Sequence, residues 1–226
     1  MVVLLVIATF AILLLIDYLR SPQPVLALQP RPAVPPAPEV AVPRTRPALV
    51  NGFFLPENLR YHPGHAWALS EGPQLVRVGL DDFAARLTGK LDRLTLPQRG
   101  QWLRQGEKTW TLHRDGAAVD MVSPIEGEVT DVNPALLLDP DLARRDPYGE
   151  GWLLTVKAPD ARTSFRNLLG GSLARFWMED SARRLQRHVP EALGAVAQDG
   201  GVALADLTTH MPDAQWTRLA REFFLS

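Results

Sequence analysis

The stretch His113–Pro124, HRDGAAVDMVSP, decides how the central part of this chain is interpreted. Asp115-Gly116 favours a two-residue hairpin turn of type I′, because both central positions of that turn need a positive φ. Trp110 and Leu112 precede the pair, and apolar or β-branched residues follow it, as in two pairing strands. We therefore predict a strand, a tight turn and a second strand. On these residues alone, an ordinary surface hairpin is the expected structure.

Other motifs surround this hairpin in a characteristic order. They are YHPGHAW (Tyr61–Trp67), VGLDDFA (Val78–Ala84), SPIEGEV (Ser123–Val129) and DPYGEGW (Asp146–Trp152). Over residues 53–160 this order and spacing resemble the H protein of the glycine cleavage system, a lipoyl-carrier β-domain. The resemblance implies a barrel-sandwich hybrid fold built from two small sheets. It also implies protein partners of the oxidoreductase and transferase classes.

The resemblance implies a lipoyl lysine at the hairpin tip, eight residues before the proline of the Ser-Pro pair, where this chain has Gly116. Glycine has no amine to acylate, and no lysine lies between Thr109 and Val156. Lys108 is eight residues from the tip, roughly 26 Å along a strand that rises about 3.3 Å per residue. We therefore predict a structural turn and no cofactor. A carrier that uses another of the three lysines (Lys90, Lys108 and Lys157) is the alternative.

The composition restricts the class of protein. With 226 residues, of which 46% are hydrophobic, one or two packed domains are expected. The net charge of −1 gives no electrostatic reason to expect nucleic acid as a partner. Cysteine is absent, which excludes disulfides, thiolate zinc sites and cysteine catalysis.

Residues 1–19 are predicted to form a transmembrane anchor. The first sixteen residues carry no charged side chain, and a helix to Leu19 would be about 28 Å long, close to the ~30 Å hydrocarbon core. A cleaved signal peptide is the alternative, although a basic n-region and an A-x-A site are not seen. Arginines follow the span and none precedes it, which predicts a body in the cytoplasm. Residues 20–50, rich in proline, are predicted to form a semi-rigid linker, with an SH3-type ligand as the alternative.

Residues 51–160 contain short strand-like runs separated by glycine and proline, which predicts a mainly β sandwich or barrel-like domain. Asp81 is expected to cap a short helix that ends at Leu87, and residues 139–145 are expected to form a single helical turn. The clearest expected strands are residues 75–79, 110–112, 128–132 and 152–156.

Residues 161–226 are predicted to form a helical C-terminal extension. Ser172 is a suitable N-cap for a helix that ends before Pro190, and Gly200-Gly201 then interrupts the chain. The second helix follows Pro212 and has one apolar face, formed by Trp216, Leu219, Ala220, Phe223 and Phe224. This face is expected to pack on the β domain or on the first helix. A partner-binding or membrane-surface face is the alternative.

No catalytic residue and no metal site is predicted. His62 and His65 lack a third ligand at metal spacing. A structural hydrogen bond is expected for His65. A solvated strand position is expected for His113, with an acid–base role as its alternative. The DPYGEGW run is expected to be structural.

Three functions fit the sequence. The first is a membrane-anchored, non-catalytic binding or scaffold subunit of a redox or metabolic complex, without a lipoylation site. The second is a lipoyl carrier of glycine cleavage that uses a non-standard lysine. The third is an enzyme subunit within a redox complex at the membrane.

Overall fold

The structure of this protein, a computed structural model, describes residues 48–188 and 211–225, all within one compact unit. The predicted mainly β class is confirmed. The strands of the described residues are β1 (Ala48–Val50), β2 (Phe53–Leu55), β3 (Arg60–Tyr61), β4 (Ala66–Ser70), β5 (Leu75–Leu80), β6 (Arg93–Thr95), β7 (Trp102–Leu103), β8 (Lys108–Arg114), β9 (Ala117–Val122), β10 (Gly127–Val132) and β11 (Leu154–Lys157). Their helices are α2 (Asp82–Thr88), α3 (Ala135–Leu138), α4 (Leu142–Arg145), α5 (Ala161–Arg166), α6 (Gly171–Arg187) and α8 (Asp213–Phe224).

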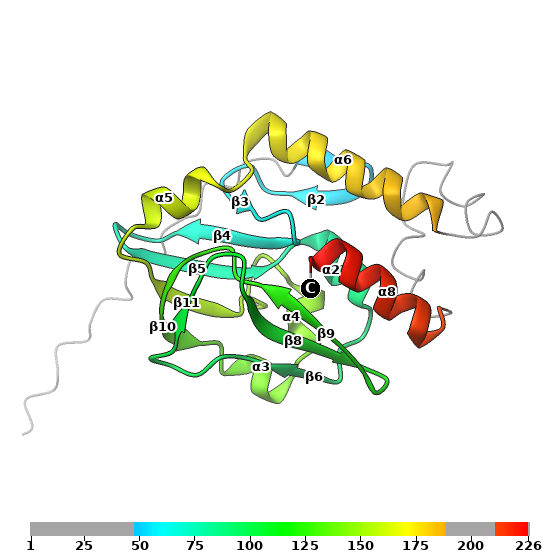
Figure 1. The fold of residues 1–226 in the computed structure, drawn as a ribbon, viewed down its shortest axis with the longest axis horizontal. Coiled ribbons are helices and arrows are strands. Elements are labelled where there is room, and N and C mark those ends of the chain that lie inside the picture. Colours follow the sequence, from blue (N-terminus) through cyan, green and yellow to red (C-terminus); the bar gives the residue numbers. More distant parts are fainter. Residues whose placement is uncertain (1–47, 189–210, 226) are drawn as a thin grey trace, which may run out of the picture. The chain divides into compact units, whose positions relative to one another are not determined.

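The strands of the described residues form three sheets, of which Figure 1 shows the arrangement. The largest has the order β3-β4-β5-β11-β10-β7, and its neighbouring strands are antiparallel. The second has the order β6-β8-β9 and contains the predicted hairpin. The third, β1-β2, is additional to the two expected sheets, because Asn51-Gly52 forms another tight turn with φ values of 46° and 84°.

Alternate residues of the central strands form the core. Val76 and Val78 of β5 are fully buried, and they pair directly with the equally buried Val156 and Leu154 of β11. A period of two is the pattern of a strand with one buried face, and burial of that face fixes the register of the pairing. The hairpin strands of the three-stranded sheet add Trp110, Leu112, Val119 and Met121 to the same hydrophobic core.

Helix α2 begins where the sequence predicts. The Asp81 carboxylate accepts a hydrogen bond from the Ala84 N–H at 2.7 Å, which satisfies a free donor of the first turn. The helix ends at Gly89, whose φ of 68° favours glycine over residues with a side chain. The chain therefore leaves α2 at a sharp turn, directly before Lys90.

Some boundaries differ from the predictions. Strand β11 begins at Leu154 instead of residue 152, because the carbonyl of Trp152 accepts from the Asn133 side chain at 2.7 Å and lies outside the ladder. Ser172 is not the N-cap, since α6 begins at Gly171 and its N-cap is Gly170. The short helix α3 was not predicted.

The prediction that the last helix packs on the β domain is confirmed. All five residues of its apolar face are buried, and α8 contacts both β9 and α2. The indole N–H of Trp216 donates to the Leu87 carbonyl at 2.9 Å, at the end of α2. In Figure 1, α8 (red) lies next to α2 and the β8–β9 hairpin. Helix α8 thereby covers the edge of β9 that would otherwise be open.

Three predictions concern residues outside the described ranges. These are the anchor at residues 1–19, nearly all of the linker at residues 20–50, and the break at Gly200-Gly201. Within residues 48–188 and 211–225, no helix is both long and apolar enough to cross a membrane.

Candidate functional site

The tip of the β8–β9 hairpin has the predicted geometry. Asp115 and Gly116 have φ values of 47° and 84°, and Arg114 pairs with Ala117 directly below them. Two consecutive positive φ angles define the type I′ turn. Both residues are exposed, and a Cβ placed on Gly116 would have no neighbour within 4 Å. Position 116 is therefore an open, solvent-facing tip without a side chain.

Contacts below the turn hold the tip in place. The Asp92 carboxylate accepts from the Asp115 N–H at 2.6 Å. The Arg114 guanidinium is 7% exposed, donates to the Thr88 carbonyl at 3.5 Å and lies 5.5 Å from the ring centre of Trp216. A guanidinium over an indole face is a favourable cation–π arrangement. The end of α2, the residues after it and α8 thus all support the hairpin tip.

The three lysines lie in different places. Lys108 pairs with Val122, at the opposite end of the hairpin from the tip, and its ammonium lies 3.5 Å from the Asp120 carboxylate. Lys157 belongs to β11, in the other sheet. Lys90 is exposed and lies between Thr88, which contacts Arg114 below the tip, and Asp92, which contacts the tip at Asp115. Sequence reasoning missed this proximity, because Lys90 is far from Gly116 along the chain.

His113 lies on the outer face of the three-stranded sheet. Its Nε2 is 2.9 Å from the Thr95 hydroxyl, and its Nδ1 is 3.3 Å from the Arg93 guanidinium. Partial burial and the neighbouring Arg93 lower the pKa of His113, while Asp120 opposes them. The imidazole is therefore a partly exposed hydrogen-bonding group of the sheet surface.

His65 makes the structural hydrogen bond that was expected for it. Its ring is fully buried, and Nδ1 lies 2.8 Å from a carboxylate oxygen of Asp81, the residue that caps α2. The ring stacks on Phe83 at 4.1 Å between centres and lies 4.5 Å from the Trp177 ring. The Tyr61–Trp67 motif is thereby tied to α2, and His65 is not accessible to a substrate.

His62 is a half-buried residue of the same turn. Its Nδ1 accepts from the Gly64 N–H at 3.0 Å, so this nitrogen must be unprotonated. Burial, followed by the proximity of His65, lowers the pKa of His62 from 6.5 to about 4. In the described part of the chain, no group of three His, Cys, Asp or Glu residues is arranged to hold a metal ion.

The DPYGEGW run forms a structural turn, as expected. The Asp146 carbonyl accepts from the N–H groups of Gly149 and Gly151 at 3.2 and 2.9 Å, and its carboxylate accepts from the Glu150 N–H at 2.8 Å. A Cβ on Gly149 would lie 2.3 Å from that carboxylate, and one on Gly151 would lie 2.6 Å from the Asp146 carbonyl. Glycine is therefore required at both positions by close packing.

The same run connects the other motifs through hydrogen bonds. The Tyr148 hydroxyl donates to the Phe54 carbonyl at 2.7 Å and accepts from the Asp82 N–H at 2.9 Å. Burial raises the pKa of Tyr148, and nearby Tyr61 and Asp81 add to the effect, so the phenol stays protonated. The Trp67 indole donates to the Pro147 carbonyl at 2.9 Å. We call the set His65, Trp67, Asp81 and Tyr148 the motif junction.

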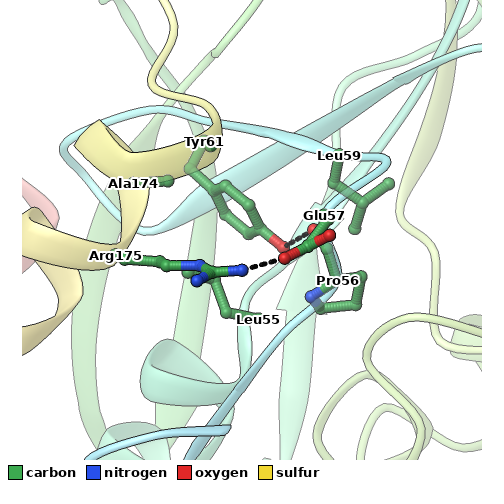
Figure 2. A pocket seen from close by; sticks show the side chains of 8 residues that line it. Leu55, Pro56, Glu57, Leu59, Tyr61, Ala174 and Arg175 are labelled. Atoms are coloured by element: carbon green, nitrogen blue, oxygen red, sulfur yellow. Dashed lines mark hydrogen bonds and ion pairs between the residues drawn. The ribbon is translucent and has the colours of Figure 1, made fainter. Parts of the chain in front are cut away.

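A small cavity lies between α6 and the β2–β3 segment (Figure 2). Its volume is about 10 Å³, the space of about one water molecule. Glu57 and Arg175 form an ion pair beside it, and the Tyr61 hydroxyl donates to the Pro56 carbonyl at 2.8 Å. Sequence reasoning did not identify this cavity, which is too small for an organic substrate.

Comparison with known proteins places the hairpin and the motif junction in a family. Residues 59–180 match the family described as Glycine cleavage H-protein. A probable glycine cleavage system H protein of Aeropyrum pernix is 38% identical over 109 residues, covering 48% of this chain and 75% of that protein. The glycine cleavage system H protein of Alteromonas mediterranea is 38% identical over 107 residues, covering 47% and 83%. The crystal structure of such a protein from Mycobacterium marinum is 29% identical, covers 52% of this chain and 94% of that chain, and gives a TM-score of 0.46.

The family match begins before β3 and ends within α6. It includes both the motif junction and the β8–β9 hairpin, and it leaves out β1, β2 and α8. The matched residues make up more than half of the 226 residues. The chain therefore belongs to the glycine cleavage H-protein family.

Proposed function

We propose that this chain is a membrane-tethered, non-catalytic protein-binding subunit whose hairpin tip carries no acyl group. The observation that supports this proposal is the glycine at position 116. The hairpin has a tight turn and the Asp92 contact that holds it, but the exposed tip position has no amine. Lipoate is held as an amide of a lysine side chain, so glycine cannot hold it. What such a domain can still do is present its surface to partner proteins.

The proposed partners are proteins of the oxidoreductase and transferase types that assemble with H proteins. The outer face of the β6-β8-β9 sheet supports this proposal, because it is polar and lies next to the exposed tip. Across the three strands of this face, His113 lies between Arg93 and Ala118, and Thr111 lies between Thr95 and Asp120. These side chains are exposed or half-buried. Exposed mixed charges of this kind govern orientation and encounter rate in protein complexes.

Binding to purified partner enzymes of the glycine cleavage system tests the proposal. The full chain is immobilised in detergent, and surface plasmon resonance is recorded with each enzyme. Arg93→Glu is expected to weaken binding about tenfold, or about 1.4 kcal/mol. Arg166→Glu, a charge reversal on exposed α5, is the matched control and should have little effect. Equal binding by wild type and Arg93→Glu, or binding to none of these enzymes, would contradict the proposed docking face.

The membrane tether is the second part of the proposal. It is supported by the uncharged residues 1–16 and by the arginines that follow them. Alkaline carbonate extraction should leave the chain in the membrane fraction. Protease added to intact spheroplasts should leave the body undigested, and it should digest the body after lysis. Release by carbonate, or digestion in intact spheroplasts, would refute the tether or its orientation.

A second candidate function, an acyl carrier that uses a lysine away from the tip, is favoured by one observation. Lys90 lies between Thr88, which contacts Arg114 below the tip, and Asp92, which contacts the tip at Asp115. The two functions are compatible, because a carrier of this kind would also be non-catalytic and would also bind protein partners.

A further inference from the structure

Helix α6 has a solvent-facing side opposite its buried one. The buried residues of the helix are Ala174, Met178, Ser181, Ala182 and Leu185. At about 3.6 residues per turn, the opposite side is a single stripe of exposed residues, namely Leu173, Phe176, Asp180, Arg183 and Arg187. Leu173 and Phe176 are each 65% exposed. Two large apolar side chains therefore begin this stripe, and two arginines end it.

Helix α8 has a similar outer side. The residues opposite its buried apolar face are exposed, and they are Ala214, Arg218, Arg221 and, directly after the helix, Leu225. The Glu222 carboxylate accepts from the Arg184 guanidinium of α6 at 2.7 Å and lies 3.7 Å from His188. This link makes the two helices neighbours. We call the outer stripes of α6 and α8 together the outer helix face.

Arginine is in excess on the outer helix face. The charged residues of the face are Asp180, Arg183, Arg187, Arg218 and Arg221. Asp180 lies 3.8 Å from Arg183, whereas no ion pair of the described residues includes Arg187, Arg218 or Arg221. The other acidic residues of the two helices, Glu179, Asp213 and Glu222, lie outside both stripes. The face therefore combines exposed apolar side chains with a positive charge.

We propose that the outer helix face binds the surface of a lipid bilayer that contains anionic phospholipids. Leu173 and Phe176 enter the boundary between headgroups and acyl chains, and the arginines bind the headgroup phosphates. A guanidinium suits this role, because it can donate two parallel hydrogen bonds to one phosphate. A bilayer presents phosphates above an apolar layer, which matches a face that has both kinds of side chain.

This inference rests on the tether of the proposed function, which keeps the body next to a bilayer, and it adds the face by which the body contacts lipid. The four arginines lie outside residues 59–180, the part of the chain that matches the family. In Figure 1, α6 lies at the top of the body and β6 at the bottom. The proposed docking face at β6 therefore lies away from α6.

The test places a fluorophore on the proposed face. The chain has no cysteine, so one introduced cysteine is the only site for a thiol-reactive label. The full chain is reconstituted in vesicles of phosphatidylcholine and phosphatidylserine, with an environment-sensitive label at Leu173→Cys or Phe176→Cys. Ala118→Cys, on the exposed face of β9, is the control site. Emission from both α6 sites is expected to shift to the blue and to be quenched by spin-labelled lipids, whereas emission from the control site stays unchanged.

The role of the arginines is tested with Arg183→Glu/Arg187→Glu in the labelled Phe176→Cys chain. Each arginine near an anionic bilayer contributes a factor of about five, so the lipid-bound population should fall about thirtyfold or more relative to the free one. The matched control is Arg99→Glu/Arg104→Glu, which changes the net charge equally through side chains that are 67% and 71% exposed elsewhere on the body. This control should keep the blue shift. Thermal unfolding checks that each variant folds.

An unchanged emission at both α6 sites in these vesicles, or an equal loss in the two double variants, would overturn the inference. A blue shift that already appears in detergent and grows with protein concentration would mean that a second copy covers this face, and would also overturn it. Carbonate extraction measures the tether separately. Release of a chain whose α6 sites still contact lipid refutes the tether alone, and retention without the blue shift refutes this inference alone.

Discussion

The motif junction and the hairpin tip lie in opposite kinds of environment, one buried and one exposed to solvent. At the junction, His65, Trp67 and Asp81 are at most 1% exposed, and each makes a hydrogen bond to another motif or helix. At the tip, Asp115 and Gly116 are exposed, and a Cβ on Gly116 would have no neighbour within 4 Å. The junction is therefore a closed, hydrogen-bonded part of the fold, whereas the residue at the tip, Gly116, has no side chain.

This difference separates the residues that stabilise the fold from the tip position at which an acyl group would be attached. Changing a buried junction residue removes packing and leaves polar groups without partners. Changing a residue at an open tip affects the stability of the fold much less. Glycine at the exposed tip of this hairpin is therefore compatible with the fold that the junction stabilises.

The largest expected effect comes from helix α8, which contacts both regions. Phe223 packs against the junction, with its ring centre 6.0 Å from that of His65, and Trp216 packs against Arg114 at the hairpin. Each large apolar side chain contributes about 1.5–3 kcal/mol by burial, so truncation after Met211 should remove much of a typical domain's 5–15 kcal/mol. The melting temperature should fall steeply. Truncation after Phe224, which removes the exposed Leu225 and the last residue, is the control. A stable, monodisperse protein lacking α8 would refute the structural role of this helix.

The next effect distinguishes a junction tryptophan from an exposed one. Trp67 is 1% exposed, and its ring lies so close to Gly79 that a Cβ there would approach it to 2.5 Å. Trp67→Ala should lower the free energy of unfolding by about 3–5 kcal/mol in urea titrations. Trp102, on edge strand β7, is 51% exposed, and Trp102→Ala should cost less than about 1 kcal/mol. Equal losses of unfolding free energy in the two variants would contradict the distinction between buried and exposed regions.

A third effect depends on pH and concerns the turn beside the junction. His62 has a pKa of about 4 in the folded chain and about 6.5 when unfolded, so the unfolded state binds more protons between these values. Stability should therefore be full above pH 6.5 and fall as the pH drops toward 4, by about 2–3 kcal/mol after allowance for solvent screening. Urea unfolding of wild type and His62→Gln measures this slope. The free energy of unfolding of the variant should change less with pH over this range. Identical slopes for the two proteins would show that His62 is not responsible.

The smallest effect is expected at the tip. Gly116 has a φ of 84°, which is strained for any residue with a side chain. Gly116→Ala should therefore lower the free energy of unfolding by about 1 kcal/mol, the order of the left-handed penalty. Ala118→Ser, on the exposed face of β9, is the matched control and should be close to neutral. A loss of several kcal/mol in Gly116→Ala would mean that the tip is as tightly constrained as the junction.

Local signals in the sequence predicted much of the fold. Asp115-Gly116 predicted the turn, Asp81 predicted the start of α2, and the spacing of Trp216 and Phe223 predicted the buried face of α8. Each signal acts over a few residues, through backbone angles, a cap or a helical period. The β1 strand was missed because the expected domain boundary fell at Asn51, inside the first hairpin.

The surroundings of the tip could not be predicted in the same way. Lys108 lies at the far end of strand β8 from Gly116, as its place in the sequence predicts, and pairs there with Val122. The place of Lys90 could not be predicted in this way, because it depends on how β6 pairs with β8 after helix α2. Contacts between distant segments depend on tertiary pairing, so only the folded structure brings this lysine to the tip.

We propose that the β8–β9 hairpin is a complete carrier hairpin from which only the amine is missing. It is tested by Gly116→Lys in a Lys90→Arg background, treated with lipoate–protein ligase, ATP and lipoate and mapped by mass spectrometry. A lipoyl adduct is expected at position 116 in this double variant, and none is expected in Lys90→Arg alone. Absence of an adduct at position 116 in the folded double variant would contradict this proposal, because the tip would then differ from a carrier hairpin in more than one residue.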